Sequence, residues 1–386
     1  MTDNDRQKIN TQPHVKSLAK KRIAILGNGQ LANMLIEASQ GLNLDVTSFV
    51  LPKVDVDAET ITRQTQQYRD LLQGFDVITY EIENIFPGLL QALTETHSVF
   101  PSISALTVSQ DRFFEKSLFS ELTIPTNEYL KIDSFNDLLQ AAEQLSFPFV
   151  LKQRRFGYDG KGQSLVQSET ALKTAWQTLG AYPLIAERFV NFDFEISQVA
   201  SRDQFGNIAF YPLVRNEHRD GILRESHLLK NDGLQKKAQT IVGSLLTHFD
   251  YVGTFAVEFF VKGGVLYANE TAPRVHNSGH WSIDGANISQ FENHLLAVSG
   301  YKVKQVALKH PYSMMINLIG EDVPNTLKTS PHIKAKSYHK TLRKGRKMGH
   351  INIVADDKEA FLNAKTAVYQ QLQANPCLQQ SDAKSP

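Results

Sequence analysis

Residues 149–163 read FVLKQRRFGYDGKGQ, and the interpretation of the whole chain starts from this stretch. An apolar run ends at Lys152, three glycines follow at Gly157, Gly160 and Gly162, and a β-prone segment comes next. This pattern predicts a strand, a flexible loop and a second strand. Because glycine lets backbone N–H groups approach a ligand closely, a loop with several cationic side chains fits a cover over phosphate groups.

Two features limit what this glycine loop shows by itself. Gly162 and Gln163 follow Lys161, whereas a Walker phosphate loop needs Ser or Thr at the start of a helix. An ordinary hairpin with a basic tip is the alternative interpretation, because glycine-rich motifs taken alone are weak signals. The motifs further along the chain decide between the two.

Size and charge bound the possible functions. The chain has 386 residues, of which 41% are hydrophobic and 21% charged, so two or three globular domains with sizeable cores are expected. The formal net charge of +1 argues against a dedicated nucleic-acid surface, which normally carries a marked basic excess. Small molecules are therefore the expected partners.

Cysteine usage and hydropathy bear on location. The single cysteine, Cys377, excludes an intramolecular disulfide and suits a reducing cytoplasm. No apolar run approaches the roughly 18 residues that span a bilayer, and residues 1–20 lack the apolar core of a signal peptide. We therefore expect a cytoplasmic protein with no membrane contact, and a polar leader over residues 1–20.

The segment that begins at Arg22 reads RIAILGNGQLANML and is typical of a Rossmann-like start. A buried-type strand leads into a tight turn at Gly27 and Gly29, and a helix with apolar spacing follows. Dinucleotide binding at this turn is one interpretation. It is disfavoured because no clean Asp or Glu closes the second expected strand, residues 44–49, where a ribose ligand is needed.

A further strand is expected over residues 75–80, and two glutamates, Glu81 and Glu83, follow its carboxyl end. These carboxylates stand at the carboxyl edge of an open α/β sheet, where such sheets usually contact their ligands. The segment from Ser109 to Arg112 is expected to open a helix. Other helices are expected over residues 133–145 and 169–179, and strands over residues 184–190, 194–200 and 207–212.

Two β-prone runs, residues 253–261 and 265–270, flank a Lys-Gly-Gly turn at residues 262–264 and predict a hairpin. The odd length of the loop places Glu258 and Glu270 on the same face of neighbouring strands. Two like charges there repel each other, and a shared hard cation with oxygen ligands, Mg²⁺, would explain their presence. The alternative is two solvated glutamates on an exposed face, which is the common situation for charged side chains.

A polar loop follows this hairpin and reads TAPRVHNSGHW over residues 271–281. It brings Arg274, His276, Asn277 and Ser278 together within a few positions. Polar loops that follow a metal-binding strand tend to be functional rather than structural, so these side chains are candidates for ligand contacts.

A third unit is expected from residue 311. A strand over residues 312–319 is followed by the basic segment YHKTLRKGRKMGH, residues 338–350, and then by a strand over residues 351–354. Taken alone, the basic segment favours a solvated hairpin, since charge runs are usually solvated faces.

Together these motifs resemble the ATP-grasp superfamily and, within it, the 5-(carboxyamino)imidazole ribonucleotide synthase family. The resemblance covers nearly the whole chain from Arg22 to Val354 and rests on the order and spacing of several motifs. The sequence departs from the family pattern at Ala32-Asn33, where Gly-Arg is common, and at Lys344, where proline is common. The motifs lie at residues 27–31, 110–112, 156–163, 187–190, 269–270, 273–274, 276–281 and 345–350.

The resemblance implies a mixed α/β and α+β protein with three-domain ATP-grasp architecture and a homodimeric assembly. After a disordered leader, residues 1–20, a Rossmann-like domain would cover residues 21–107. The ATP-grasp domain would cover residues 108–310, and a small carboxyl-terminal domain with a polar tail residues 311–386.

The implied reaction carboxylates 5-aminoimidazole ribonucleotide with bicarbonate, with ATP as co-substrate and Mg²⁺ as cofactor. Bicarbonate is a poor electrophile, and phosphorylating it to carboxyphosphate would create a leaving group. The products would be 5-(carboxyamino)imidazole ribonucleotide, ADP and phosphate, in de novo purine biosynthesis.

The resemblance also implies roles for individual residues. Glu258 and Glu270 would bind the metal and act in catalysis together with Lys152 and Arg274. One set would bind ATP: Arg112, Lys152, Gly157, Tyr158, Asp159, Gly160, Lys161, Gly162, Gln163, Glu187, Arg188, Phe189, Val190, Glu195, His218, Asn269 and Glu270. Another set would bind the other substrates: Tyr158, Lys161, Arg274, His276, Asn277, Ser278, Lys340 and Arg346.

Two other functions are weighed against this one. Another ATP-grasp carboxylase or ligase would share the nucleotide-binding residues without the basic segment of the third unit. A non-catalytic nucleotide-binding module should have lost a metal-binding carboxylate, whereas both Glu258 and Glu270 are present.

Overall fold

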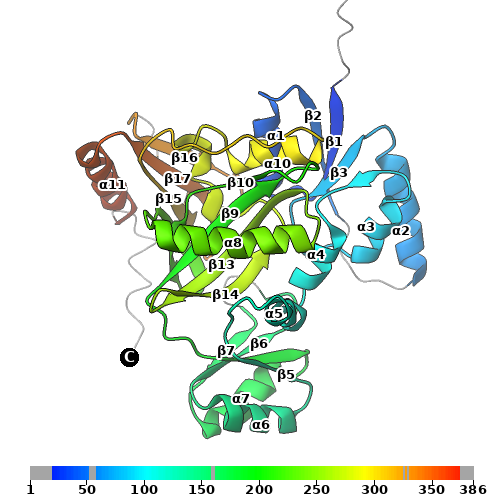
Figure 1. Cartoon of the computed structure of the whole chain (residues 1–386), viewed down its shortest axis with the longest axis vertical. Helices are drawn as coiled ribbons and strands as arrows, with labels where there is room; N and C mark the ends of the chain where they lie inside the picture. Colours follow the sequence, from blue (N-terminus) through cyan, green and yellow to red (C-terminus); the bar gives the residue numbers. More distant parts are fainter. Residues whose placement is uncertain (1–19, 52–57, 158–160, 325–326, 328–329, 374–386) are drawn as a thin grey trace, which may run out of the picture.

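The computed structural model describes residues 20–51, 58–157, 161–324, 327 and 330–373 (Figure 1). The expected leader, except for Lys20, lies outside the described residues, as do Tyr158, Asp159 and Gly160 of the glycine loop and the tail with Cys377. The described chain forms three β-sheets with helices packed against them. Among the described residues, no helix combines the length and the apolar character that a membrane span requires.

The first sheet is parallel, with the strand order β2-β1-β3-β4, and it confirms the Rossmann-like amino-terminal domain. In β1, Ile23 and Ile25 pack against α1 and α10, whereas Ala24 and Leu26 pack against the side of α2 and α3. A strand covered on both faces is apolar throughout, which explains the run IAIL over residues 23–26. The elements are β1 (Lys21–Leu26), α1 (Gln30–Ser39), β2 (Leu44–Phe49), α2 (Ala58–Leu71), β3 (Val77–Tyr80), α3 (Pro87–Leu93) and β4 (Ser98–Val99).

The connection to the second sheet contains two helices. The segment from Ser109 to Arg112 opens a helix as expected, but its first residue, Ser109, also ends a helix that was not expected, α4 (Ile103–Ser109). The next helix, α5 (Arg112–Glu121), begins at Arg112 because the Asp111 carboxylate accepts the backbone N–H of Phe113 at 3.0 Å and caps it.

The second sheet is antiparallel, with the order β5-β8-β6-β7, and forms the small unit at the bottom of Figure 1. Two helices, α6 and α7, cover one face of it, and Ser134 forms a capping box with Asp137 at the start of α6. The glycine loop joins β6 to the edge strand β7. The elements are β5 (Tyr129–Ile132), α6 (Phe135–Leu145), β6 (Phe149–Gln153), β7 (Gln163–Val166), α7 (Glu169–Leu179) and β8 (Leu184–Arg188).

The third sheet has nine strands, in the order β14-β13-β9-β11-β12-β15-β17-β16, with β10 paired to β9. One face packs against α8, the other against α10, and α11 covers β15 and β17. Its elements up to residue 298 are β9 (Phe194–Arg202), β10 (Ile208–Phe210), β11 (Val214–Arg219), β12 (Ile222–Leu228), α8 (Asp232–His248), β13 (Gly253–Lys262), β14 (Val265–Ala272), η1 (Asn277–Gly279), α9 (Ser282–Gly285) and α10 (Gln290–Val298).

The segment expected to form a third unit continues this same sheet. Its first strand, β15, pairs with β12, so the carboxyl-terminal strands extend the sheet rather than building a separate one. The remaining elements are β15 (Tyr312–Ile319), β16 (Ile333–Ser337), β17 (Lys347–Ala355) and α11 (Lys358–Gln373).

Candidate active site

A cavity of about 640 Å³ is lined by residues that belong to all three sheets or follow their strands. Glu81 and Glu83 follow β3, Lys152 belongs to β6, and Glu258 belongs to β13. Thirteen of the predicted site residues line it: Arg112, Lys152, Gly157, Lys161, Gln163, Glu195, His218, Glu258, Asn269, Glu270, Arg274, His276 and Asn277. The other predicted residues within the described ranges do not line it: Gly162, Glu187, Arg188, Phe189, Val190, Ser278, Lys340 and Arg346.

The hairpin of β13 and β14 carries two carboxylates into the cavity. Glu258 and Glu270 are direct partners in the register of these strands and lie on the same face, as predicted. The predicted reason, an odd-length loop, is wrong, because Lys262 pairs with Val265 across a two-residue turn. A bulge adjoins the pair, because Phe259 pairs with Ala268 and Asn269 is the extra residue. Bulges re-aim side chains, which explains how the consecutive residues Asn269 and Glu270 both line the cavity.

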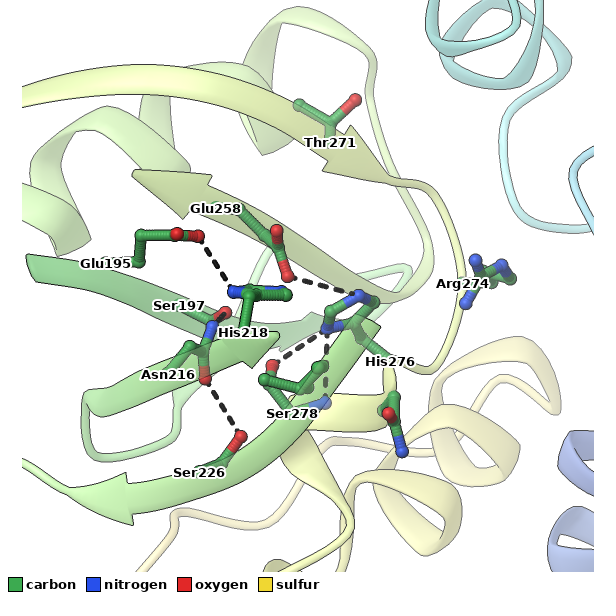
Figure 2. Close-up of polar contacts among 12 residues, drawn as sticks. Glu195, Ser197, Asn216, His218, Ser226, Glu258, Thr271, Arg274, His276 and Ser278 are labelled. Carbon is green, nitrogen blue, oxygen red and sulfur yellow. Dashed lines mark hydrogen bonds and ion pairs between the residues drawn. The ribbon is translucent and has the colours of Figure 1, made fainter. Parts of the chain in front are cut away.

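Glu258 lies in a dense group of titratable side chains (Figure 2). Ligand atoms of Glu195, His218 and Glu258 all lie within 4.8 Å of one another. His218 Nδ1 is 2.9 Å from Glu195 Oε2, and His276 Nε2 is 3.6 Å from Glu258 Oε1. Burial and then the charge of Glu270 raise the pKa of Glu258 to about 7. A hard cation fits this group, because it would relieve the repulsion between carboxylates.

The two imidazoles of this group differ in their preferred charge. Burial lowers the pKa of His218, but the contact with Glu195 and the charge of Glu258 outweigh it and raise the pKa above its ordinary value. Burial and then the charge of Arg274 lower the pKa of His276 well below its ordinary value. His276 is therefore the neutral imidazole, and its Nδ1 lies 2.8 Å from Ser278 Oγ.

A row of buried polar side chains lies behind these carboxylates (Figure 2). Ser226 Oγ donates to Asn216 Oδ1 at 2.9 Å, and Asn216 Nδ2 donates to Ser197 Oγ at 2.5 Å. Ser197 is the register partner of Glu258, and Asn216 is the register partner of Glu195. The row therefore ties β12, β11 and β9 together at the level of the site.

Arg274 faces the cavity from the loop after β14. Its guanidinium group forms an ion pair with Glu83 at 2.9 Å and donates to the Val275 carbonyl at 2.9 Å. Burial raises the pKa of Glu83, and the charge of Arg274 opposes that rise. An anionic ligand at this place would compete with Glu83 for the same guanidinium group.

Lys152 reaches the cavity from β6 and pairs with a carboxylate of the neighbouring strand β8. Its Nζ donates to Glu187 Oε2 at 3.1 Å, and Asn127 Nδ2 donates to the same oxygen at 2.8 Å. Burial raises the pKa of Glu187, but the charges of Lys152 and Lys116 outweigh burial and lower it to about 2. Glu187 is therefore an ionised carboxylate at neutral pH.

Residues Gln110 and Asp111 fix the root of the glycine loop to the chain that precedes α5. Gln110 Oε1 accepts a hydrogen bond from Arg155 Nη2 at 2.7 Å. The Asp111 carboxylate accepts two from Arg154, at 2.9 and 2.7 Å, and both side chains are largely buried. These contacts bring two motifs that are separate in the sequence into one structural unit.

Two arginines predicted to bind ATP use their guanidinium groups within the protein. Arg112 donates to the carbonyls of Gln153 and Gly157 at 3.0 and 3.2 Å, so it supports the glycine loop while it lines the cavity. Arg188 forms an ion pair with Glu128 at 2.8 Å and does not line the cavity.

The basic segment at residues 338–350 reaches the cavity through Lys347, which sequence reasoning did not single out. Lys340 Nζ donates at 2.5 Å to Gln30 Oε1, and Gln30 lines the cavity. Arg346 donates to a carbonyl of its own turn at 3.2 Å. The segment therefore stands next to the Rossmann-like domain rather than alone in solvent.

The turn after β1 holds a carboxylate where a dinucleotide would place its pyrophosphate. The Glu81 carboxylate accepts the backbone N–H groups of Gly29 and Ala32, at 2.5 and 3.1 Å, at the N-terminus of α1. A Cβ atom at Gly29 would lie 2.6 Å from Glu81 Oε1. The carboxylate takes the position that a pyrophosphate would need, so the dinucleotide interpretation is excluded.

Two buried charged residues of α5 were not predicted. Glu115 accepts the backbone N–H and the hydroxyl of Thr271 at 2.7 and 2.6 Å, and it lines the cavity. Lys116 is buried and lies 3.7 Å from Glu187. The available signal was spacing, because both residues precede the apolar Phe119 by one helical turn and share its buried face.

Family models match most of the chain and define its class. An ATP-grasp domain model matches residues 117–291, and a ribonucleotide synthetase preATP-grasp domain model matches residues 20–110. A phosphoribosylaminoimidazole carboxylase C-terminal domain model matches residues 313–364. The chain is therefore an ATP-grasp protein.

The N5-carboxyaminoimidazole ribonucleotide synthase of Pseudomonas aeruginosa is 39% identical over 355 residues, which cover 90% of this chain and 98% of that protein. The chain belongs to the N5-carboxyaminoimidazole ribonucleotide synthase family. It is accordingly an ATP-dependent ligase of purine biosynthesis, and the family resemblance inferred from the sequence is confirmed.

Solved structures agree with this assignment. The N5-carboxyaminoimidazole ribonucleotide synthetase from Thermus thermophilus has a TM-score of 0.83 and 37% identity, and the match covers 92% of this chain and 99% of that one. The N5-carboxyaminoimidazole synthase from Aspergillus clavatus, in complex with ADP and 5-aminoimidazole ribonucleotide, has a TM-score of 0.81 and 26% identity over 92% and 99% of the chains.

Proposed function

We propose that the cavity binds ATP, bicarbonate and 5-aminoimidazole ribonucleotide and joins the last two through carboxyphosphate. The observation that carries this assignment is the direct pairing of Glu258 with Glu270 in a cavity that Lys152 and Arg274 also line. These side chains supply cation ligands, a phosphate partner and an oxyanion partner in one place. Phosphorylation of a carboxylate-like substrate requires that set.

The chemical order follows from the reactants. Bicarbonate becomes an electrophile when one of its oxygens takes the γ-phosphoryl group of ATP, which forms carboxyphosphate and releases ADP. On the direct route, the amine of the ribonucleotide forms a bond to the carboxyl carbon of carboxyphosphate while the bond from that carbon to the phosphate oxygen breaks. On the other route, that bond breaks first and releases CO₂, and the amine then adds to the carbon of CO₂. The amine loses a proton, and phosphate leaves.

Glu258 and Glu270, with Asn269 beside them, would hold Mg²⁺, because they offer hard oxygen donors and the two carboxylates repel each other. A cation bound there neutralises charge on the transferred phosphoryl group. Lys152 contributes a point charge to the phosphates, and backbone N–H groups of the glycine loop cover them.

The nucleoside lies against the second sheet in this proposal. Glu187 and the Val190 backbone form hydrogen bonds to the edge of the adenine. They belong to the segment of residues 187–190, in which Arg188 ends β8 and Phe189 follows it. Glu195 accepts the ribose hydroxyls, which is supported by its place in the cavity lining and by the short distance, 2.9 Å, between its carboxylate and His218. Arg112 contributes by fixing the glycine loop above the nucleotide.

Arg274 binds bicarbonate, because a planar guanidinium group matches a planar oxyanion at two points. It exchanges its ion pair with Glu83 for the substrate. Asn277 and the neutral His276 offer further polar contacts in the cavity, and Ser278 holds the His276 ring in place.

The 5′-phosphate of the ribonucleotide is assigned to Lys340 and Arg346, together with Tyr158 and Lys161 of the glycine loop. Burial and then the charge of Arg346 lower the pKa of Lys340, which supports a gathering of cations at this place. A dianionic phosphate relieves that repulsion.

Release of ADP, measured with each co-substrate omitted in turn, tests the proposal. We expect full turnover only with ATP, bicarbonate and 5-aminoimidazole ribonucleotide together. Turnover with glycinamide ribonucleotide and formate, or with biotin, in place of 5-aminoimidazole ribonucleotide would assign the chain to another ATP-grasp reaction.

Homodimeric assembly and a cytoplasmic location are further parts of the proposal, and they rest on the family resemblance and the single cysteine. Sedimentation equilibrium of the purified protein tests the dimer.

A further inference from the structure

Lys116 is a buried amine that meets three acceptors. Its Nζ donates to Thr126 Oγ1 at 2.9 Å, to Asn127 Oδ1 at 2.7 Å and to the Ala268 carbonyl at 3.0 Å. The residue is 1% exposed. Only the protonated ammonium group has three N–H bonds with which to donate to all three acceptors. Burial lowers the pKa of Lys116, but the three acceptors and the charge of Glu187 favour the protonated form and so a positive charge inside the protein.

This ammonium group sets the direction of the Asn127 amide. Because an ammonium group only donates, Asn127 turns its Oδ1 toward Lys116 and its Nδ2 away from it. The Nδ2 then donates to Glu187 Oε2 at 2.8 Å. Lys116 therefore holds the oxygen end of the amide while Glu187 accepts from its nitrogen end, and without the ammonium group the Asn127 side chain would lose the contact that fixes its position.

The donors around Glu187 converge on one of its two oxygens. Asn127 Nδ2 and Lys152 Nζ donate to Oε2, and Lys116 Nζ lies 3.7 Å from the same atom. The other oxygen, Oε1, is buried and accepts no hydrogen bond from the described residues. A buried carboxylate oxygen without a donor costs free energy, so it marks the place of a donor from a ligand.

Glu187 lies on the cavity side of the second sheet. Its register partner on β6 is Val150, which lines the cavity, as does Lys152 two positions further along that strand. Paired residues of antiparallel strands point to the same face. Glu187 does not itself line the cavity, but its free oxygen lies on the face of the sheet whose residues Val150 and Lys152 do.

We propose that Lys116 is a positioning residue for purine recognition, which holds Asn127 and Glu187 so that Oε1 stays a free, ionised acceptor for the exocyclic amino group of adenine. The inference rests on the proposed adenine contact of Glu187 and names the residue that enforces it. A 6-oxopurine presents an oxygen where adenine presents an amino group, so Oε1 repels it. Lys116 thereby contributes to a preference for ATP over ITP.

The test compares kcat/KM for ATP and for ITP in the complete carboxylation assay. Lys116→Met should lower the preference for ATP at least about 10-fold, chiefly through a higher KM for ATP, because the acceptor is no longer held. The matched control is Lys131→Met on β5, whose Nζ pairs with Asp133 at 2.6 Å and whose side chain is 44% exposed. This control should keep the wild-type preference.

Glu187→Gln separates the inference from the proposed function. A Glu187→Gln enzyme that keeps the full preference for ATP would overturn the adenine contact and, with it, the role of Lys116. Loss of preference in Glu187→Gln but not in Lys116→Met would overturn the role of Lys116 alone. An equal loss with ATP and ITP in Lys116→Met would show a merely structural role and would also overturn it.

Asn127→Leu is the second variant, and it decides the matter if Lys116→Met does not fold. It keeps the ammonium group but removes the donor to Glu187 Oε2, so the preference for ATP should again decrease. An unchanged preference in a folded Asn127→Leu enzyme would contradict the proposed route from Lys116 to Glu187. The dependence of ADP release on 5-aminoimidazole ribonucleotide, measured in parallel, reports separately on the proposed reaction.

Discussion

The two sheets that flank the cavity each bury a glutamate, but they hold the two side chains in opposite electrostatic states. In β8, the charges of Lys152 and Lys116 overcome burial and lower the pKa of Glu187 to about 2. In β13, burial and the charge of Glu270 raise the pKa of Glu258 to about 7. Both residues are largely buried, at 1% and 9% exposure, so the difference in sign comes from the neighbours, which oppose the effect of burial at Glu187 and add to it at Glu258.

This difference distinguishes two kinds of charge cluster. In one, the protein supplies the counter-charge; in the other, a ligand would supply it. In the cluster of Lys116, Lys152 and Glu187, the carboxylate is balanced by cations of the protein itself, with one positive charge in surplus. The pair of Glu258 and Glu270 gathers like charges, which is the arrangement that a divalent cation would complete. Substitutions in balanced clusters should therefore be felt first in folding or in nucleotide choice, and substitutions in the carboxylate pair first in catalysis.

The largest effect on stability is expected for another balanced carboxylate, Asp111. Asp111→Asn leaves the buried Arg154 guanidinium group without its counter-charge, and the free energy of unfolding should decrease by about 3–5 kcal/mol. Urea denaturation measures the change. Asp250→Asn is the control, because Asp250 also pairs with an arginine but is 90% exposed. A loss no larger than in this control would contradict the account of a buried balanced pair.

Glu270→Gln should have the largest effect on catalysis. It removes one charge of the pair, and the loss of a metal ligand should lower kcat at least about 100-fold while the fold is kept. Glu217→Gln on β11, a half-exposed glutamate paired with Arg215, is the control and should retain activity. Steady-state rates at saturating Mg²⁺ check this. If Glu270→Gln retained most of its activity there, the assignment of the metal site would be wrong.

The lowered pKa of Glu187 predicts how the free energy of unfolding depends on pH. The sign is opposite to that expected for a carboxyl group with a raised pKa. A carboxyl group whose folded pKa is depressed stabilises the fold above its ordinary pKa, 4.5, and loses this contribution as the pH falls toward about 2. At about pH 6, Glu187→Gln should therefore lower the free energy of unfolding by about 3 kcal/mol. The difference from wild type should shrink below the ordinary pKa. A difference that grows on acidification would contradict the balanced state of Glu187.

The sequence predicted what depends on local pattern. The hairpin around residues 262–264 and the strand ends at the glycine loop follow from turn residues and a period of two. The shared face of Glu258 and Glu270 was predicted too, but from a three-residue loop, whereas the turn has two residues and the bulge at Asn269 brings the two glutamates into register. The charge balance did not follow, because Lys116 and Glu187 lie far apart in the sequence and only tertiary packing brings them together. α10 was also missed, since all but one of its residues are buried and no amphipathic period marks it.

The basic segment shows a second limit of sequence reasoning. Arg346 was predicted to face the site, but Lys347, the next residue, lines the cavity. Lys347 begins β17, and a shift of one residue in a strand moves a side chain to the opposite face. The presence of a cationic turn could therefore be predicted, but not which of its neighbouring cations lines the cavity.

Arg346→Ala has the smallest expected effect. It tests whether Arg346 or its neighbour Lys347 binds the 5′-phosphate of the ribonucleotide. The 5′-phosphate does not react, so its contacts should be felt largely as substrate binding, with a smaller loss in kcat if they also position the amine. We expect KM for 5-aminoimidazole ribonucleotide to rise about 10- to 100-fold, as for one charge-assisted contact, and KM for ATP to change far less.

Lys344→Ala provides the control for Arg346→Ala, because it removes an exposed charge of the same turn. Lys347→Ala extends the comparison to the residue that lines the cavity. If Arg346→Ala matched Lys344→Ala while Lys347→Ala raised KM for the ribonucleotide, the phosphate contact would belong to Lys347. If Arg346→Ala instead weakened ATP binding and kept the affinity for the ribonucleotide, the basic segment would belong to the nucleotide site, and the proposed division between the sheets would be wrong.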